Sequence, residues 1–142
     1  MTDHKNQIPQ LFLRLAVSVT MLSAVADRFG FWGKDSAWGN WANFEKYTQQ
    51  LTFFLPESFS TISAYAATSL EILFPLMLIT GWKTRIAAYG SGFLLLVFAL
   101  SMTVALGPKA PLDFSVWVGS AGAFLLAVQS RYFFSIDHLT QK

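Results

Sequence analysis

Two charged side chains, Arg14 and Glu71, stand inside apolar stretches of the sequence. Glu71 is the one charged residue in the stretch 61–80, and Arg14 lies about one turn inside the apolar stretch 11–29. A charge near the centre of a bilayer is costly, so such a group faces protein or a wet cavity and not lipid. A guanidinium beside a carboxylate can place a polar ligand or relay a proton, or it can simply hold helices together. The residue types leave both roles open.

Pro75 follows Glu71 by four residues. Because proline has no backbone N–H, the carbonyl of residue 71 lacks its helical donor, and we expect a helix kink there. The residues that share a helical face with Glu71 are spaced by three and four; they are Ala64, Thr68, Pro75 and Leu78. The face is narrow near the acid, so another helix can approach it closely.

Composition indicates that lipid surrounds these stretches. Of the 142 residues, 54% are hydrophobic and 13% are charged, against about 25% charged in a soluble domain. The net charge of +2 comes without a basic run, which argues against a nucleic-acid partner and leaves the lipid bilayer as the expected one. The chain has no cysteine, which excludes disulfides, thiolate metal sites and iron–sulfur clusters within it.

We therefore predict an all-α integral membrane four-helix bundle, with residues 1–142 as a single transmembrane domain. The expected spans are about 11–29, 61–80, 86–106 and 112–134, each long enough to cross the hydrocarbon core. Small residues predict close packing of the last two spans; they are Ala87, Ala88, Ser91, Gly92, Gly119 and Ala123. Gly81 is suited to end the second helix.

The segment between the first two spans is rich in tryptophan, as expected at a membrane surface. From Trp41 to Phe54 its apolar residues follow a helical period, which predicts a short amphipathic helix that ends before Pro56. This helix either lies on the membrane or packs as a lid over the bundle, and the two positions are compatible.

The first span also imitates a secretory signal, with Ala24-Val25-Ala26 before Asp27. We expect it to be retained as a helix, because Arg14 interrupts its apolar region. Four spans place both termini on one side, and we expect that side to be cytoplasmic because it carries more basic residues. The termini side has Lys5, Arg14, Lys83, Arg85, Arg131 and Lys142; the other side has Arg28, Lys34, Lys46 and Lys109.

Depth in the bilayer predicts which charges meet. Arg14 lies about 5 residues and Glu71 about 10 residues from the termini side, an axial gap of about 7 Å that two long side chains can bridge. We therefore predict a buried Arg14–Glu71 pair. Near the opposite surface we predict an outer polar cluster of Asp27, Arg28 and Asp113.

The sequence assigns no catalytic residue, no cofactor-binding residue and no metal ligand. His4 and His138 stand in polar tails, which argues against haem ligation inside the bundle, and no phosphate-binding or dinucleotide motif is present. A quinone or another small lipid could bind beside Arg14 and Glu71, with Trp82 or Tyr89 at headgroup level.

The chain resembles the DoxX-like family of small bacterial membrane proteins. The resemblance rests on LRLAVSVTMLSAVADRFGFWG and TSLEILFPLMLITGWKTR, with Arg14, Glu71, Gly81 and Arg85 at the family's positions. Asp27-Arg28 stands where the family often has a Gly and then a Lys. The resemblance implies a four-helix inner-membrane fold and, for some relatives, membership of quinone-linked redox assemblies with a partner protein.

Two functions stay open, and the sequence does not decide whether the protein is an enzyme. In the first, the protein is the membrane subunit of a redox assembly and uses its buried polar site for a quinone or a proton. In the second, it is non-catalytic and carries a small lipophilic solute or scaffolds partners.

Overall fold

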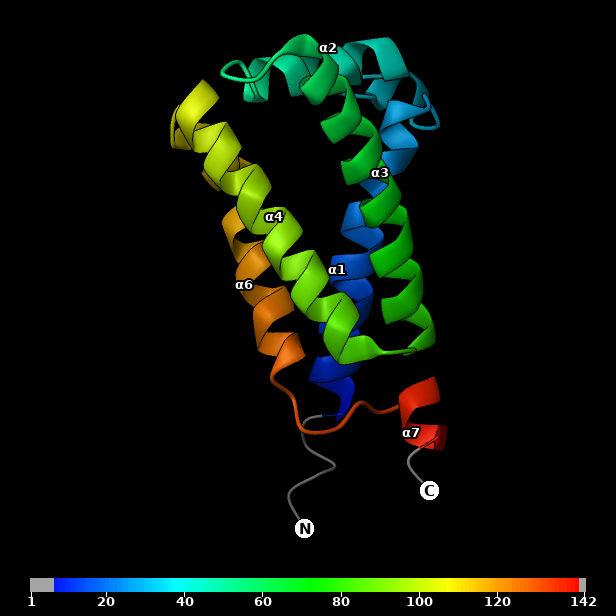
Figure 1. Cartoon of the computed structure of the whole chain (residues 1–142). Coiled ribbons are helices and arrows are strands. Elements are labelled where there is room, and N and C mark those ends of the chain that lie inside the picture. Colours follow the sequence, from blue (N-terminus) through cyan, green and yellow to red (C-terminus); the bar gives the residue numbers. More distant parts are fainter. Residues whose placement is uncertain (1–6, 141–142) are drawn as a thin grey trace.

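The computed structural model describes residues 7–140, and this part of the chain is helical without strands (Figure 1). The all-α prediction is confirmed, whereas the expectations for His4, Lys5 and Lys142 lie outside the described residues. The elements are α1 (Gln7–Arg28), the 3-10 turn η2 (Gly33–Asp35), α2 (Trp41–Leu51), α3 (Glu57–Thr80), α4 (Thr84–Leu106), α5 (Lys109–Asp113), α6 (Val116–Ala127) and α7 (Ile136–Thr140).

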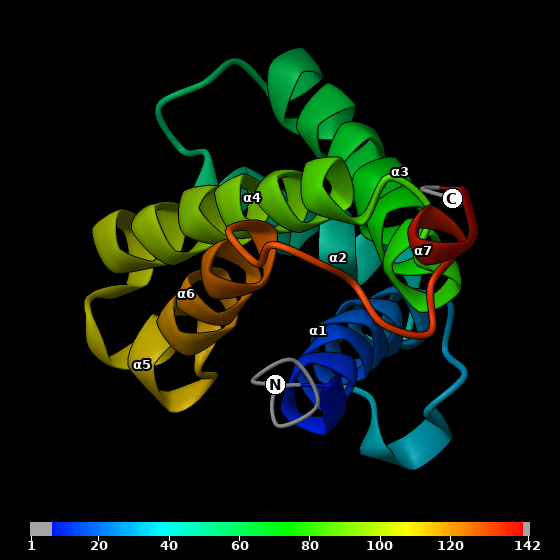
Figure 2. The same cartoon turned by 90° about the horizontal axis from the view of Figure 1, so that it is seen from below.

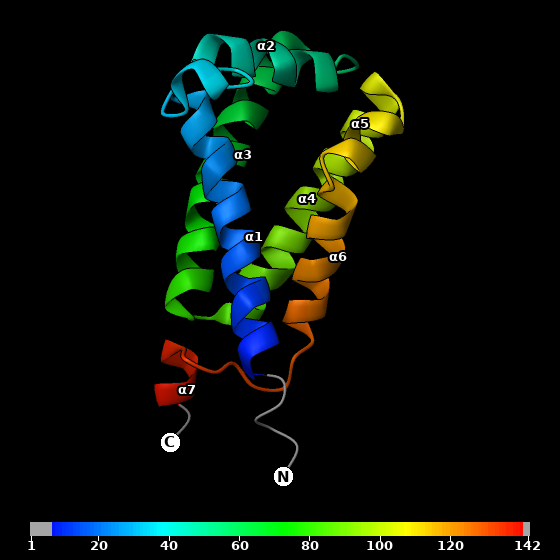
Figure 3. The ribbon, with the colours of Figure 1, turned by 180° about the vertical axis from the view of Figure 1, so that it is seen from behind.

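Three of these helices, α1, α3 and α4, are long and apolar enough to cross a membrane by length and composition, and α6 is a shorter apolar helix. The helices α1 and α3 run antiparallel side by side, and α4 packs along α6 (Figures 1 and 3). We call the end that holds α7 and the α3–α4 turn the terminal end. The opposite end, which holds α2 and α5, is the loop end.

Large apolar side chains point outward from the long helices. Phe12 is 73% exposed on α1, Ile62 is 62% exposed on α3 and Val97 is 57% exposed on α4. Water-soluble monomers rarely expose contiguous apolar surface of this kind. The outward faces therefore suit a hydrocarbon environment.

The face predicted around Glu71 is confirmed. Ala64, Thr68, Glu71, Pro75 and Leu78 are all buried, and α3 continues as one helix through Pro75. The spacing of these residues was sufficient to predict the buried face, because steps of three and four place side chains one above another on a helix.

The small face of α4 also packs as expected. Ala87, Ala88 and Ser91 are fully buried, and the Ser120 hydroxyl of α6 donates a 2.8 Å hydrogen bond to the carbonyl of Gly92. A Cβ on Gly92 would lie 3.0 Å from the Phe124 ring. Small residues thus let α4 and α6 approach closely.

The helix α6 is shorter than the predicted span 112–134. It begins at Val116, after Ser115 in the left-handed conformation, and ends at Ala127. The Tyr132 hydroxyl lies 3.2 Å from the carbonyl of Leu126 and 3.1 Å from that of Ala127, so it supplies a donor to the last turn. Residues 128–135 then leave the helix and cross below the bundle to α7 (Figure 2).

Candidate functional site

Glu71 forms its ion pair with Arg28, the last residue of α1. The two side chains are 2–3% exposed, and Nη2 of Arg28 contacts Oε2 of Glu71. Nη1 of Arg28 also donates a 2.7 Å hydrogen bond to the Thr68 hydroxyl, one turn from Glu71 on the same face of α3. A guanidinium, a carboxylate and a hydroxyl therefore meet between α1 and α3, away from water.

The predicted Arg14–Glu71 pair is wrong in its partners, although both residues are buried. The depth estimate assumed that the two helices end level, whereas α1 extends further than α3 at the terminal end (Figures 1 and 3). This offset brings Arg28 down toward Glu71 and moves Arg14 away from it. Sequence depth also gives no rotation about the helix axis.

Arg14 binds backbone carbonyls of the segment 128–135. Its guanidinium donates to the carbonyl of Phe133 at 3.0 Å and to that of Phe134 at 2.6 Å. One turn earlier on α1, the Gln10 amide donates to the carbonyl of Arg131 and accepts from the N–H of Phe133. The first turns of α1 thus fix the crossing segment below the bundle.

Aromatic rings from the loop end cover the Arg28 guanidinium. Cζ of Arg28 lies 3.8 Å from the centroid of the Phe44 ring and 5.6 Å from that of Trp38. Cation–π contacts of this type favour a charged guanidinium where water is excluded. Since Phe44 is buried on α2, α2 acts as a lid over the ion pair.

The predicted outer cluster of Asp27, Arg28 and Asp113 does not form as a whole: Asp27 and Arg28 interact electrostatically, whereas Asp113 has another partner. The Asp27 carboxylate instead accepts the N–H groups of Ala37, Trp38 and Gly39 at 2.7, 2.8 and 3.2 Å, which fixes the loop that carries Trp38. Asp113 pairs with Lys109, one turn away on the exposed helix α5. Adjacent residues on a helix point about 100° apart, so Asp27 and Arg28 face different neighbours.

A regular spacing on α1 could have indicated Arg28. Arg14, Ser18, Met21, Val25 and Arg28 follow steps of four and three, and all are buried on one face. The cation–π partners Phe44 and Trp38 carry no comparable signal, because their distance to Arg28 is set by the way α2 and the loop before it pack on α1.

The other residues considered for a ligand lie elsewhere. Trp82 is 48% and Tyr89 is 39% exposed, both near the terminal end of α4. Among residues 7–140, no group of three or more His, Asp or Glu side chains could hold a metal ion.

Comparison with known proteins assigns the family. The DoxX family model matches residues 10–104, which is more than half of the 142-residue chain. No curated protein and no solved structure matches the sequence. The matched region contains α2, α3 and all of α1 except its first three residues, and with them every side chain of the Arg28–Glu71 site. Three of the described helices are long and apolar enough to cross a membrane. On the family match, the chain belongs to the DoxX family.

Proposed function

We propose that this DoxX-family protein is a membrane subunit or accessory of a quinone-linked redox assembly, and that the Arg28–Glu71 pair with its α2 lid is the quinone site. The observation that carries the proposal is the complete burial of this ion pair between helices that suit a lipid environment. Ionisable groups buried within membrane spans are costly, and they commonly mark ligand sites or proton pathways.

The residues present fit a quinone ring. Its carbonyl oxygens need donors, and Nε of Arg28 is buried without a hydrogen-bond partner among the described residues. The rings of Trp38 and Phe44 offer flat apolar surfaces beside the guanidinium.

An open hollow of about 530 Å³ adjoins this cluster at the loop end. Its lining consists of Trp38, Asn43, Lys46, Tyr47 and Gln50, and its volume is within the usual range of small-molecule sites. Burial raises the pKa of the Tyr47 hydroxyl above its ordinary value, so this group stays a proton donor at neutral pH. Trp38 belongs both to the hollow and to the cover of Arg28, so the hollow lies next to the buried pair.

In this site a bound quinone supplies two-electron, two-proton redox chemistry. Arg28 would donate to a ring oxygen, and Glu71 would hold or release a proton next to it. The α2 lid would exclude water, which strengthens both interactions. A partner protein would exchange electrons with the ring.

A second function is supported by the way the pair satisfies itself. Arg28 already has Glu71, Thr68 and the Phe44 ring as partners. A purely structural role, in which these contacts hold α1, α2 and α3 together, therefore accounts for them as well. The protein would then carry a lipophilic solute or scaffold partners without taking part in a reaction.

Quinone retention distinguishes these functions. The protein is purified from bacterial membranes in mild detergent, and extracted ubiquinone and menaquinone are quantified per chain. We expect about one quinone per wild-type chain and an approximately tenfold lower content in Glu71→Gln, because a hydrogen bond to a charged group contributes about 1.5–3 kcal/mol. Glu57→Gln is the matched control, since it makes the same change at an exposed position of α3.

Thr68→Val gives a second test, because it preserves side-chain shape while it removes the hydroxyl that Arg28 contacts. Wild-type protein without quinone would refute the redox proposal. So would a Glu71→Gln protein that keeps its quinone while its melting temperature falls, which is the result expected of a purely structural pair.

We also propose that the protein resides in the bacterial inner membrane with the terminal end in the cytoplasm. The described part of the terminal end carries Lys83, Arg85 and Arg131, and Lys5 and Lys142 adjoin it in sequence. The absence of cysteine permits a clean labelling test. An impermeant maleimide should label Lys34→Cys on spheroplasts, and His138→Cys only after lysis; the opposite pattern would reverse the orientation.

A further inference from the structure

Large apolar side chains face outward on several sides of the loop end. Three segments carry them: residues 29–32 after α1, residues 53–59 from the end of α2 to the start of α3, and residues 112–114 at the end of α5. Figure 2 shows these segments on different sides of the bundle, and Figures 1 and 3 show all of them at the loop end. We call their side chains the loop-end belt; its members, each more than half exposed, are Phe29, Phe31, Trp32, Phe53, Phe54, Phe59, Leu112 and Phe114.

Exposed charges accompany each segment of the loop-end belt. Lys34 adjoins the first segment, Glu57 lies within the second, and Asp113 lies within the third. Aromatic rings mixed with charges suit the headgroup level of a bilayer, where the rings contact lipid and the charges contact water. Neither the hydrocarbon centre nor bulk water suits both kinds of side chain.

The helix α2 shows which side of the belt faces water. Its buried residues, Phe44, Thr48 and Leu51, pack toward the bundle. Its exposed polar side chains, on another side of the helix, are Asn43, Lys46 and Gln50. Two segments of the belt flank α2 in the sequence, one before it and one after it. The polar side of α2 therefore marks the water side of the belt.

The belt is continuous with the outward apolar face of α3. Phe59 begins a stripe of exposed residues spaced by three and four, and they are Phe59, Ile62, Ala66, Ser69, Leu73 and Leu76. The Ser69 hydroxyl donates a 2.8 Å hydrogen bond to the carbonyl of Tyr65, so this polar group is satisfied within the helix. The stripe suits lipid along the span, and it leads directly to the belt.

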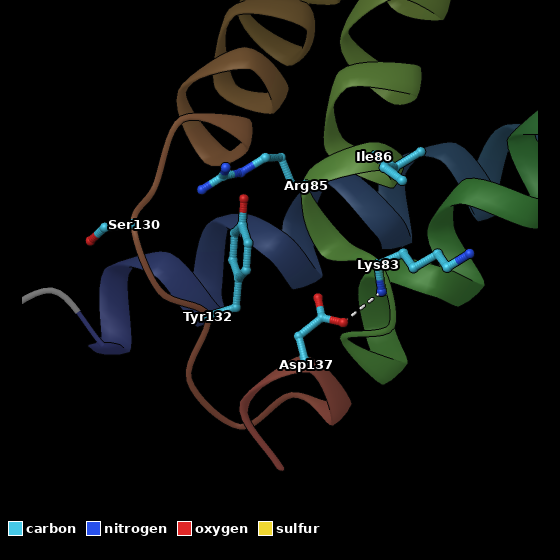
Figure 4. A pocket seen from close by; sticks show the side chains of 6 residues that line it. All are labelled: Lys83, Arg85, Ile86, Ser130, Tyr132 and Asp137. Atoms are coloured by element: carbon cyan, nitrogen blue, oxygen red, sulfur yellow. Dashed lines mark hydrogen bonds between the residues drawn. The ribbon is translucent and has the colours of Figure 1, made fainter. Parts of the chain in front are cut away.

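The opposite end of α4 is polar. Lys83, Arg85 and Asp137 line a hollow there (Figure 4), and the backbone N–H of Lys83 donates a 2.7 Å hydrogen bond to the Asp137 carboxylate. Since α4 has 23 residues, about 35 Å separate this charged end from the belt segment that follows α4. A bilayer has a hydrocarbon core of about 30 Å and measures about 40–45 Å with its headgroups. The length of α4 thus fits charged groups at one surface and the belt at the other.

We infer that the loop-end belt lies in the interface of the lipid bilayer, with the polar side of α2 toward the water. A partner protein or a second copy of the chain would cover one side of the molecule, whereas a planar bilayer meets every side at one level. The belt therefore sets the depth of the protein in the membrane and holds the α2 lid at the membrane surface. This inference is independent of the quinone proposal, since it involves neither Arg28 nor Glu71.

The depth of spin labels tests the inference. Because the chain has no cysteine, a single nitroxide can be attached to Phe31→Cys, Phe54→Cys or Phe114→Cys, one in each segment of the belt. The full chain is placed in nanodiscs of phosphatidylethanolamine and phosphatidylglycerol. Power saturation with oxygen, which concentrates in lipid, and with a water-soluble nickel complex gives the depth of each label. We expect all three labels about 5–10 Å inside the headgroup boundary, the usual depth of interfacial side chains.

Two further labels provide the controls. Lys46→Cys, on the polar side of α2, should be fully accessible to the nickel complex. Val97→Cys, near the middle of α4, should lie deeper in the lipid than the belt does. All the labelled positions are exposed, so the substitutions leave the core of the bundle intact.

Three results would overturn the inference. The first is a belt label as accessible to the nickel complex as the label on Lys46→Cys, which would place that segment in water. The second is a belt label shielded from both reagents, which would show that protein covers it. The third is a spread in depth among the belt labels of more than about 15 Å, half of the hydrocarbon core, which would exclude a common level.

Discussion

Arg28→Met should lower the free energy of unfolding by about 3–5 kcal/mol, the usual cost of removing one member of a buried ion pair. The substitution leaves the Glu71 carboxylate buried without its cation, and it removes the partner of the Thr68 hydroxyl. It also ends the contact with the Phe44 ring. Unfolding in micelles with a rising fraction of sodium dodecyl sulfate measures this loss.

The double variant Arg28→Met/Glu71→Leu separates the buried charge from the packing. It leaves no unpaired ion, so it should recover most of the stability that the single variant loses. Lys34→Met is the control, since it removes an exposed cation from the same end and should change stability by no more than about 0.5 kcal/mol. Equal losses in the single and double variants would show that the burial of an unpaired Glu71 is not the cause.

Arg14→Met should release the crossing segment while the rest of the bundle stays folded. The guanidinium holds the carbonyls of Phe133 and Phe134, and hydrogen bonds that involve a charged group contribute about 1.5–3 kcal/mol each. Backbone amides in residues 131–137 should therefore exchange with deuterium at least about tenfold faster, since 1.4 kcal/mol corresponds to a factor of ten. Hydrogen exchange read by mass spectrometry measures this change.

The site of the change distinguishes the two arginines. Arg28→Met should accelerate exchange around α2 and the loop that Asp27 holds, and it should affect residues 131–137 less than Arg14→Met does. Lys109→Met removes a cation whose side chain is 83% exposed and should affect neither region. Unchanged exchange in residues 131–137 of Arg14→Met would contradict the role given to Arg14.

The two arginines show how far sequence reasoning reaches in this protein. The cost of charge in hydrocarbon indicated that Arg14 and Glu71 would be buried, and both are. The partners could not be read in the same way. Arg14 binds backbone carbonyls about 120 residues away along the chain, and a carbonyl has no sequence signature because every residue carries one.

The C-terminal region gives a second example. Hydropathy predicted a span to residue 134, because Val128, Tyr132 and Phe133 continue the apolar pattern. The helix ends at Ala127, where the Tyr132 hydroxyl reaches the last carbonyls. Hydropathy reports the preference of a residue for lipid, and it contains no information about such a tertiary hydrogen bond.

The sequence by itself determined the membrane character, the all-α class, the family resemblance and the buried faces of α3 and α4. These properties follow from composition and from the helical repeat, which act within one segment. Only the tertiary structure decided that Arg28 pairs with Glu71, that α2 covers this pair, and that residues 128–135 fold back onto Arg14. Those contacts depend on the level and rotation of one helix against another, which the packing of the whole chain sets.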